Sequence, residues 1–336
     1  MVAIRDFNGD GILDFVVVNG NGNTVSVLLG VGNGRFGSQT TFPTGLSPFS
    51  IAVGDFNSDE RLDLAVVNKG DNTMSVLFGT GSGSFGPQII YATNPSPFYI
   101  VVGDLNGDSR LDLVVANYYS SNVGVFLGVD NGNFGPQTTY PTVGTPTFIG
   151  IDDFNGDAHL DLAIISYNWA TVSVLLGTGT GAFRLQTTFS TSFAPYSLAI
   201  GDLNGDGRVD LVLGSIKPLL YSVGVFFGNG NGSFGLQTTF SGGSTSRPAW
   251  ITISDFNGDG ITDIAVSNYL SSIPNVGVLR GTGNGSLVLQ TTIATGSSSS
   301  LTGIAAADFN NDGRLDLVVC DNSANKRVNI FLNTCT

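Results

Sequence analysis

The segment GDLNGDGRVDLVLGS, residues 201–215, is an aspartate-rich loop followed at once by an apolar run. Its core recurs as DFNGDGILD (6–14), DFNSDERLD (55–63), DLNGDSRLD (104–112), DFNGDAHLD (153–161), DLNGDGRVD (202–210), DFNGDGITD (255–263) and DFNNDGRLD (308–316). The seven copies follow one another at intervals of 49 to 53 residues. A fixed period of this length indicates a repeat architecture, so the loop is the unit from which the chain is built.

Each repeat contains four short segments that are typical of β-strands. In the second repeat they are FSIAVGD, LDLAVVN, TMSVLFG and PQIIYAT, which are rich in β-branched and aromatic residues and bounded by Gly, Asn, Asp or Pro. A glycine-rich motif such as LFGTGSGSFGPQ lies between the third and fourth segments of the first six repeats. The pattern predicts an all-β chain that forms a seven-bladed β-propeller with four-stranded antiparallel blades.

The propeller is expected to be a single domain over residues 1–336, because a closed ring is one domain whatever its length. Its blades are expected at residues 1–44, 45–93, 94–142, 143–191, 192–241, 242–295 and 296–336. Only six fourth strands can be counted, since the sequence stops at NIFLNTCT. Blade 7 is therefore expected either to lack its outer strand or to be completed by a continuation of the natural protein. An unpaired third strand would be an exposed edge at which another chain could associate.

Composition restricts the class of protein. Hydrophobic residues make up 41% of the chain and charged residues 12%, with 47 glycines, which is too apolar for a disordered chain and too rich in glycine for a helical one. A formal net charge of −13 argues against a nucleic-acid partner, and no apolar run is long enough for membrane insertion. Cys320 and Cys335 form no disulfide framework, and a bridge between them is left open.

The aspartate loop has the spacing D-x-N-x-D-x-x-x-D, with carboxylates at loop positions 1, 5 and 9 and an amide at position 3. Alternate side chains of a tight turn can point to one centre, and such an all-oxygen donor set suits Ca²⁺ better than Mg²⁺, which requires stricter octahedral geometry. An EF-hand is excluded, because it closes with Glu at position 12 and enters a helix. Up to seven calcium ions would nearly cancel the net charge of −13. The predicted side-chain ligands are Asp6, Asn8, Asp10, Asp14, Asp55, Asn57, Asp59, Asp63, Asp104, Asn106, Asp108, Asp112, Asp153, Asn155, Asp157, Asp161, Asp202, Asn204, Asp206, Asp210, Asp255, Asn257, Asp259, Asp263, Asp308, Asn310, Asp312 and Asp316.

Loop position 6 varies among the seven copies. It is glycine in four of them, but blades 2, 3 and 4 carry Glu60, Ser109 and Ala158. If the turn requires a positive φ at this position, these three residues are strained. Blades 2, 3 and 4 are then expected to have the weakest or emptiest calcium sites.

The repeat core, followed by LGxGxGxFG, resembles the FG-GAP/VCBS repeats of integrin-α-like propellers over essentially the whole chain. The resemblance implies that the loop joins the first two strands of a blade and holds calcium through side chains at positions 1, 3, 5 and 9 and the backbone carbonyl at position 7. The alanine–proline half of the namesake motif is missing after the second strand, which places the chain nearer the VCBS branch than the integrins. The implied carbonyl ligands are those of Ile12, Arg61, Arg110, His159, Arg208, Ile261 and Arg314.

The connectivity places aspartate loops and glycine turns on one face of the blades, and the second-to-third and fourth-to-first connections on the other. These other connections vary in sequence and are rich in aromatic residues. Exposed rings beside Asn, Ser and Thr suit a sugar or a protein side chain, while packing is the favoured interpretation for Phe49, Phe98 and Tyr196. The candidate ligand residues are Tyr118, Tyr119, Tyr167, Trp169, Trp250 and Tyr269.

No catalytic machinery is predicted, so the chain is not expected to be an enzyme. The single histidine, His159, lies inside an aspartate loop, and the acidic residues outside the loops are scattered. The favoured function is a calcium-binding recognition module, adhesive or lectin-like, that binds a glycan or an extracellular protein. The alternatives are a structural propeller within a larger surface protein and a polysaccharide-active enzyme. An extracellular or cell-surface location is expected, because weak calcium sites fill only near millimolar calcium.

Overall fold

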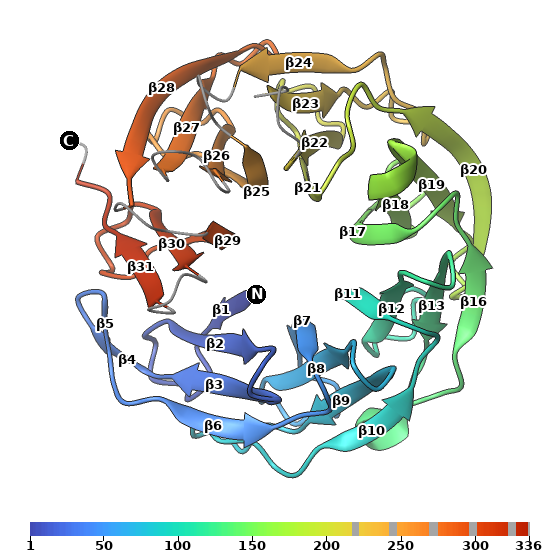
Figure 1. Cartoon of the computed structure of the whole chain (residues 1–336), viewed down its shortest axis with the longest axis vertical. Coiled ribbons are helices and arrows are strands. Elements are labelled where there is room, and N and C mark those ends of the chain that lie inside the picture. The colour runs from blue at the N-terminus through green and yellow to red at the C-terminus, as the bar shows by residue number, and fades with distance from the viewer. Residues whose placement is uncertain (217–221, 242–246, 269–274, 296–300, 322–326, 335–336) are drawn as a thin grey trace. The chain divides into compact units, whose positions relative to one another are not determined.

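The computed structural model describes residues 1–216, 222–241, 247–268, 275–295, 301–321 and 327–334. The described chain forms six four-stranded antiparallel sheets and one three-stranded sheet, each made from one sequence repeat (Figure 1). The predicted all-β, seven-bladed propeller is therefore confirmed. Two short 3-10 turns, η1 (Asp130–Gly132) and η2 (Tyr167–Trp169), were not expected from the sequence.

The first strand of each blade leads into the aspartate loop. These strands are β1 (Val2–Arg5), β7 (Pro48–Gly54), β11 (Pro97–Gly103), β17 (Pro146–Asp152), β21 (Ser197–Gly201), β25 (Pro248–Ser254) and β29 (Leu301–Ala307). The second strand begins at the aspartate of loop position 9 in every blade. The second strands are β2 (Asp14–Asn19), β8 (Asp63–Asn68), β12 (Asp112–Asn117), β18 (Asp161–Ser166), β22 (Asp210–Gly214), β26 (Asp263–Asn268) and β30 (Asp316–Asp321).

The third strand follows the variable connection, and the fourth follows the glycine turn. The third strands are β3 (Thr24–Leu28), β9 (Thr73–Leu77), β13 (Asn122–Phe126), β19 (Thr171–Gly177), β23 (Ser222–Phe226), β27 (Asn275–Gly281) and β31 (Arg327–Phe331). The fourth strands are β6 (Thr40–Pro43), β10 (Ile89–Ala92), β16 (Thr138–Pro141), β20 (Phe183–Ser190), β24 (Thr238–Ser241) and β28 (Leu287–Ala294). The glycine turns of blades 1 and 3 add small hairpins, formed by β4 (Gly30–Gly32) with β5 (Arg35–Phe36) and by β14 (Gly128–Val129) with β15 (Asn133–Phe134).

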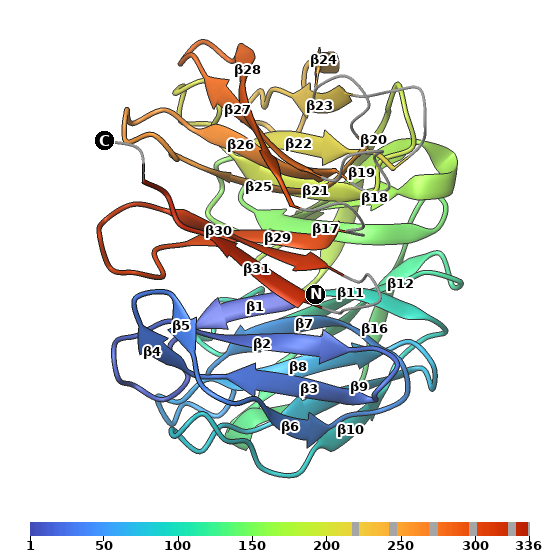
Figure 2. The same cartoon turned by 60° about the vertical axis from the view of Figure 1, so that its left-hand side comes forward.

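Burial falls from the second strand of a blade to the fourth. All six residues of β8 and of β12 are buried, because both faces of these strands are covered, whereas β6 and β10 are mostly exposed. The apolar runs after each aspartate loop are thus central strands of their sheets. The twisted layering of β1, β2, β3 and β6 can be followed in Figure 2.

The chain comprises two compact units. Unit 1 comprises Met1–Ile151, Ala158–Trp169 and Ser173–Thr188, and unit 2 comprises Asp152–Asp157, Ala170–Val172 and Phe189–Thr336. Within unit 1, Val67 and Met74 of blade 2 pack with Leu113 of blade 3, and within unit 2 Val212 of blade 5 packs with Ile264 of blade 6. Apolar side chains of neighbouring blades therefore form the core of each unit, and the extent of the single domain stays a prediction.

Blade 7 has three strands in the described part of the chain, in the order β29-β30-β31. A blade without an outer strand among these residues is one of the two arrangements expected from the sequence. Cys320 is buried and free, and Cys335 lies outside the described residues, so the possible bridge stays untested. In the described residues no helix has the length and apolar character needed to cross a membrane.

Candidate calcium loops and the aromatic surface

The aspartate at loop position 1 organises the turn by accepting backbone N–H groups. In blade 5, Asp202 Oδ1 accepts from Asn204, Gly205 and Asp206 at 3.2, 2.7 and 3.2 Å, and its Oδ2 accepts from Gly207 at 2.8 Å. The same four bonds form in blade 1 around Asp6. These bonds fold the backbone of positions 3 to 6 around the position 1 carboxylate. The convergence of the oxygens of positions 1, 3 and 5 on one centre stays a prediction.

The turn requires a positive φ at two positions rather than one. At position 6, φ is +65° in each of Glu60, Ser109 and Ala158, close to the +77° of Gly207. Position 4 is also left-handed, with φ of +60° at Ser58 and +61° at Asn311 where the other blades have glycine. Position 4 is a requirement that sequence reasoning missed, although glycine at five of its seven copies carried the signal. Blade 2 is the one copy of the loop that has a residue other than glycine at both positions, Ser58 at position 4 and Glu60 at position 6.

Replacing Glu60 by glycine is expected to stabilise the protein by about 0.5 to 1 kcal/mol, because glycine adopts φ near +65° without a steric penalty. The reverse change at the same loop position, Gly207→Ala, is expected to destabilise by a similar amount. An added Cβ at Gly207 meets nothing within 4 Å, so the backbone conformation alone is tested. Urea denaturation of both variants measures the effect, and a loss of stability in Glu60→Gly would contradict it.

The aspartate at position 9 is held differently from the others. Each of the seven is fully buried at the start of its second strand. In blade 2, Asp63 Oδ2 accepts from the N–H of Phe56 at 2.9 Å, and its Oδ1 accepts from the N–H of Gly79 at 2.8 Å. Gly79 is the first glycine of the glycine turn, so this carboxylate ties the aspartate loop to the end of the third strand. In blade 7 Asn333 makes the corresponding bond to Asp316 at 2.7 Å.

The first glycine of the turn must lack a side chain. A Cβ added at Gly79 would overlap the backbone carbonyl oxygen of Leu62, and five other blades repeat this close approach at Gly30, Gly128, Gly177, Gly228 and Gly281. The aspartate motif and the glycine motif are therefore two halves of one junction. Sequence reasoning treated the two motifs as separate turns, although their nearly constant separation was a signal of the junction: the glycine follows the position 9 aspartate by 16 residues in blades 1 to 4 and by 18 in blades 5 and 6.

The charges of the loop interact at close range. Burial raises the pKa of Asp63 to about 6, against the two backbone N–H bonds that lower it, and the carboxylates of Asp59 and Asp55 add a smaller rise. The pKa of Asp206 is held below its usual range, chiefly by the hydrogen bond from the Arg208 side chain at 2.8 Å. A bound cation would offset the smaller contribution, the repulsion between the Asp63 carboxylate and those of Asp59 and Asp55.

The donor chemistry of the loop fits calcium, since carboxylate, amide and carbonyl oxygens are its usual ligands. In blade 2 the N–H of Asp59 donates to the side-chain oxygens of Asp55 and Asn57. The third carboxylate, that of Asp63, is engaged by backbone N–H groups of two segments. Among the described residues, no group of three or more acidic, histidine or cysteine side chains is placed to hold a metal ion. Calcium in these loops therefore stays a prediction.

A family model described as FG-GAP-like repeat matches residues 6–66, 55–115, 104–164, 153–213, 220–266 and 268–319. These matches span most of the chain and start at the aspartate loop in the first four blades. The chain belongs to the FG-GAP-like repeat family. The resemblance predicted from the loop and the glycine turn is thereby confirmed.

Solved structures share the fold of this FG-GAP-like repeat protein at low sequence identity. BBS1N in complex with ARL6DN has a TM-score of 0.70 at 12% identity, covering 100% of this chain and 92% of that one. The periplasmic gluconolactonase of Pseudomonas aeruginosa has a TM-score of 0.63 at 15% identity, covering 97% and 87%. A protein from Lactobacillus plantarum has a TM-score of 0.60 at 14% identity, covering 98% and 94%. No curated protein matches the chain.

Four of the six candidate ligand residues of the FG-GAP-like repeat protein lie in connections after a second strand, within unit 1. Tyr119 and Trp169 are 73% and 63% exposed, while Tyr118 and Tyr167 are partly buried. Trp250 lies within strand β25 instead of a loop, where its ring packs edge-to-face on Tyr196 at 5.7 Å. Tyr269 lies outside the described residues.

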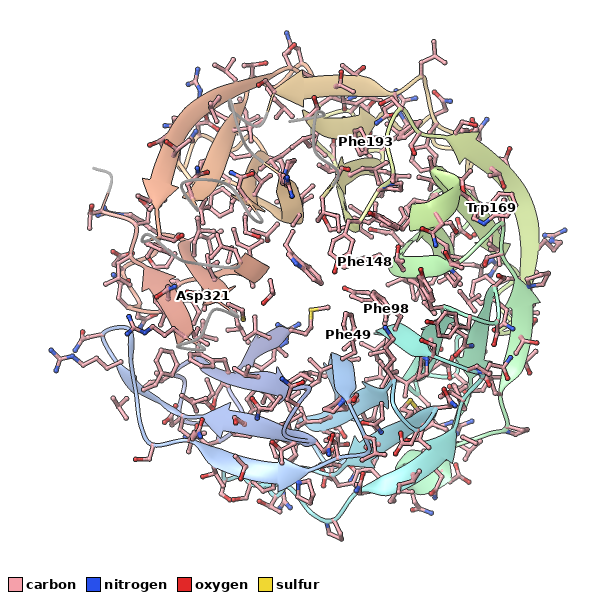
Figure 3. All side chains as sticks on the ribbon, viewed as in Figure 1. Phe49, Phe98, Phe148, Trp169, Phe193 and Asp321 are labelled. Carbon is pink, nitrogen blue, oxygen red and sulfur yellow. The ribbon has the colours of Figure 1, made fainter. Side chains whose placement is uncertain are left out.

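The indole ring of Trp169 packs against the backbone at Gly144 and is otherwise largely exposed. The ring lies so close over Gly144 that a Cβ there would overlap the indole, while most of the side chain remains exposed (Figure 3). The neighbouring Asn168 donates to the hydroxyl of Tyr118 at 3.0 Å. This bond joins the variable connections of blades 3 and 4 within unit 1.

Phe49, Lys69 and Phe98 form a second group of side chains around Tyr118. The rings of Phe49 and Phe98 lie 4.1 Å apart, and Tyr118 lies 5.6 Å from Phe98. The ammonium of Lys69 lies over all three rings, at 5.7, 4.9 and 5.9 Å from their centroids. We call Phe49, Lys69, Phe98, Tyr118 and Tyr119 the aromatic–lysine cluster. Sequence reasoning missed Lys69, whose signal was its position directly after the second strand, where blades 3 and 4 have tyrosine.

Proposed function

We propose that this protein is an extracellular or cell-surface recognition module, stabilised by calcium in its aspartate loops, that binds a glycan on the surface formed by Tyr118, Tyr119, Asn168 and Trp169. The observation that carries the proposal is Trp169, an exposed indole supported from below by Gly144 and flanked by Asn168. An aromatic ring with a polar rim suits a sugar, because the ring stacks on the apolar face and the rim orients the hydroxyl groups.

Calcium is proposed to act in the structure rather than in ligand contact. The loops join first to second strands, whereas Trp169 and Tyr119 lie after second strands, at the opposite ends of their blades. When bound, the ion would supply the positive charge that holds positions 1, 3 and 5 of a loop together, with the carbonyl at position 7. The extracellular location rests on calcium supply, since weak sites require calcium near the millimolar range.

A glycan array probed with the full chain in calcium tests the proposal. Trp169→Ala is expected to weaken binding about tenfold or more, because stacking of a ligand ring on one aromatic side chain is worth about 1 to 3 kcal/mol where nucleic-acid bases stack in this way. Trp169→Phe is expected to keep part of the affinity. The matched control is Trp250→Phe, which changes an indole that packs on Tyr196 within a strand. Binding to no glycan by a folded, calcium-loaded chain would refute the sugar ligand.

Two alternatives to glycan binding involve no catalysis. The protein would bind an extracellular protein ligand, or it would have a purely structural role within a larger surface protein. An enzyme is the alternative from a different class, favoured by the fold that the chain shares with a gluconolactonase. We propose no catalytic role, because the single histidine, His159, lies in an aspartate loop with its ring over Gly179. Hydrolysis of gluconolactone by the purified chain would favour the enzyme instead.

Strand association at blade 7 is a further proposed contact. The outer edge of β31 has no fourth strand among the described residues, unlike the third strands of the other six blades. Unpaired backbone groups at such an edge can pair with a strand of another chain. We propose neither a nucleic-acid partner nor membrane insertion.

A further inference from the structure

The aromatic–lysine cluster holds a cation at a fixed place on the surface. The Lys69 ammonium lies within 6 Å of the centroids of three rings, of which Phe98 is nearest at 4.9 Å. An ammonium over aromatic faces is attracted by their quadrupoles, which restricts its flexible side chain to one region. The cluster therefore presents a positive charge whose position is set before any ligand arrives.

The backbone fixes the rings that surround this charge. Pro48 pairs with Asn68 and Ser50 with Val67, which leaves Phe49 as the extra residue of a β-bulge. Phe98 is the extra residue of the corresponding bulge in blade 3. A bulge redirects the side chain that it carries, and such bulges are frequent beside binding sites. The backbone N–H of Lys69 also donates to Ser47 at 3.1 Å, so the lysine is tied to the segment that leads into this bulge.

The cluster offers hydrogen-bond donors without matching acceptors. In the part of the chain that the structure describes, no carboxylate pairs with Lys69; Asp71 of the same turn accepts instead from the N–H of Leu46 at 3.0 Å and the hydroxyl of Thr73 at 2.8 Å. The hydroxyl oxygen of Tyr118 accepts from Asn168, which leaves its proton free to donate. An ammonium beside a free hydroxyl proton matches the two oxygens of a carboxylate.

We propose that the aromatic–lysine cluster binds the carboxylate of an acidic sugar, a uronic acid unit, whose ring lies on the exposed faces of Tyr119 or Trp169. This inference rests on the proposed glycan-binding function and names the ligand class. The exposed fractions of 73% for Tyr119 and 63% for Trp169 leave both rings available for stacking. The ring of Tyr119 lies 5.2 Å from that of Tyr118, and Trp169 directly follows Asn168, which donates to the Tyr118 hydroxyl. The carboxylate distinguishes this ligand from neutral sugars, because a hydrogen bond between an ammonium and a carboxylate is about twice as strong as one between neutral groups.

The test compares an oligogalacturonate with its methyl ester, which keeps the ring and removes the charge. Isothermal titration of the full chain in calcium is expected to show binding of the acid about ten- to a hundredfold tighter than binding of the ester, as for a hydrogen bond to a charged group. Lys69→Gln is expected to reduce this preference to near one, with the affinity for the ester unchanged. Lys69→Arg keeps the charge and is expected to keep most of the preference.

Arg35→Gln is the matched control, because it removes one exposed positive charge from the glycine-turn hairpin of blade 1. The control is expected to keep the preference for the acid, and thermal melting verifies that each variant is folded. Equal binding of acid and ester by the unmodified chain would overturn the inference and leave the glycan function standing. Failure to bind these probes or any glycan on the array would overturn the proposed function itself. A preference that survives in Lys69→Gln would also overturn the role of the cluster.

Discussion

Gly79→Ala is expected to destabilise the protein by about 2 to 5 kcal/mol, from overpacking together with the weakening of a charge-assisted hydrogen bond. The added methyl group would overlap the carbonyl oxygen of Leu62, which belongs to the backbone and cannot rotate away. Any movement that relieves this overlap lengthens the bond from the Gly79 N–H to Asp63, which is 2.8 Å. The junction between the aspartate loop and the third strand is therefore expected to open.

Gly86→Ala is the matched control within the same glycine turn. A Cβ at Gly86 would meet only the carbonyl oxygen of Phe78, at an ordinary 3.7 Å, and the Gly86 N–H bond to that oxygen does not require glycine. Its effect on the free energy of unfolding is expected to stay within about 0.5 kcal/mol. Urea denaturation followed by tryptophan fluorescence measures both variants. Equal stability of the two would refute the close approach as the reason why glycine stands at this position in six repeats.

Chelation of calcium is expected to lower the melting temperature of the protein. A site filled at a hundred times its dissociation constant contributes about 2.7 kcal/mol to stability, and on the order of 5 °C in melting temperature. With several loops filled, the combined shift exceeds that of any single substitution above. Differential scanning calorimetry with and without a chelator measures it, and metal analysis of the dialysed protein counts the bound ions.

Asp202→Ala identifies the loop as the source of this effect. The change removes the carboxylate at position 1 of blade 5, which accepts four backbone N–H groups, and is expected to reduce the calcium count by one. Asp130→Asn is the control, because it removes an equally negative but 88% exposed carboxylate outside the aspartate loops. An unchanged melting temperature after chelation, with no calcium in the dialysed protein, would refute the calcium sites.

Much of the fold could be predicted because each repeat contains the strand-forming runs and turn residues that specify its own blade. The blade number follows from seven aspartate loops, and the strands follow from short β-branched runs bounded by turn residues. The three strands described in blade 7 correspond to the three strand segments of the last repeat. The positive φ at Glu60 could be anticipated because four other copies have glycine at the same position. These features depend on residues close together in the chain.

The remaining features depend on residues that packing brings together from separate segments. Asp63 was predicted only as a metal ligand, but the packed sheet buries it between the N–H groups of Phe56 and Gly79. Trp250 was expected in a loop, yet the pairing of β25 with β26 places it inside a strand.

The repeat pattern alone specifies the blades, because strand and turn preferences act over a few residues. The aromatic–lysine cluster, in contrast, forms only when neighbouring blades pack. Phe49 and Lys69 belong to blade 2 and Tyr118 to blade 3, and they meet because β7 and β11 lie side by side. No local pattern marks such a meeting, because the attraction between an ammonium and a ring depends on their separation in space and not on their separation in sequence.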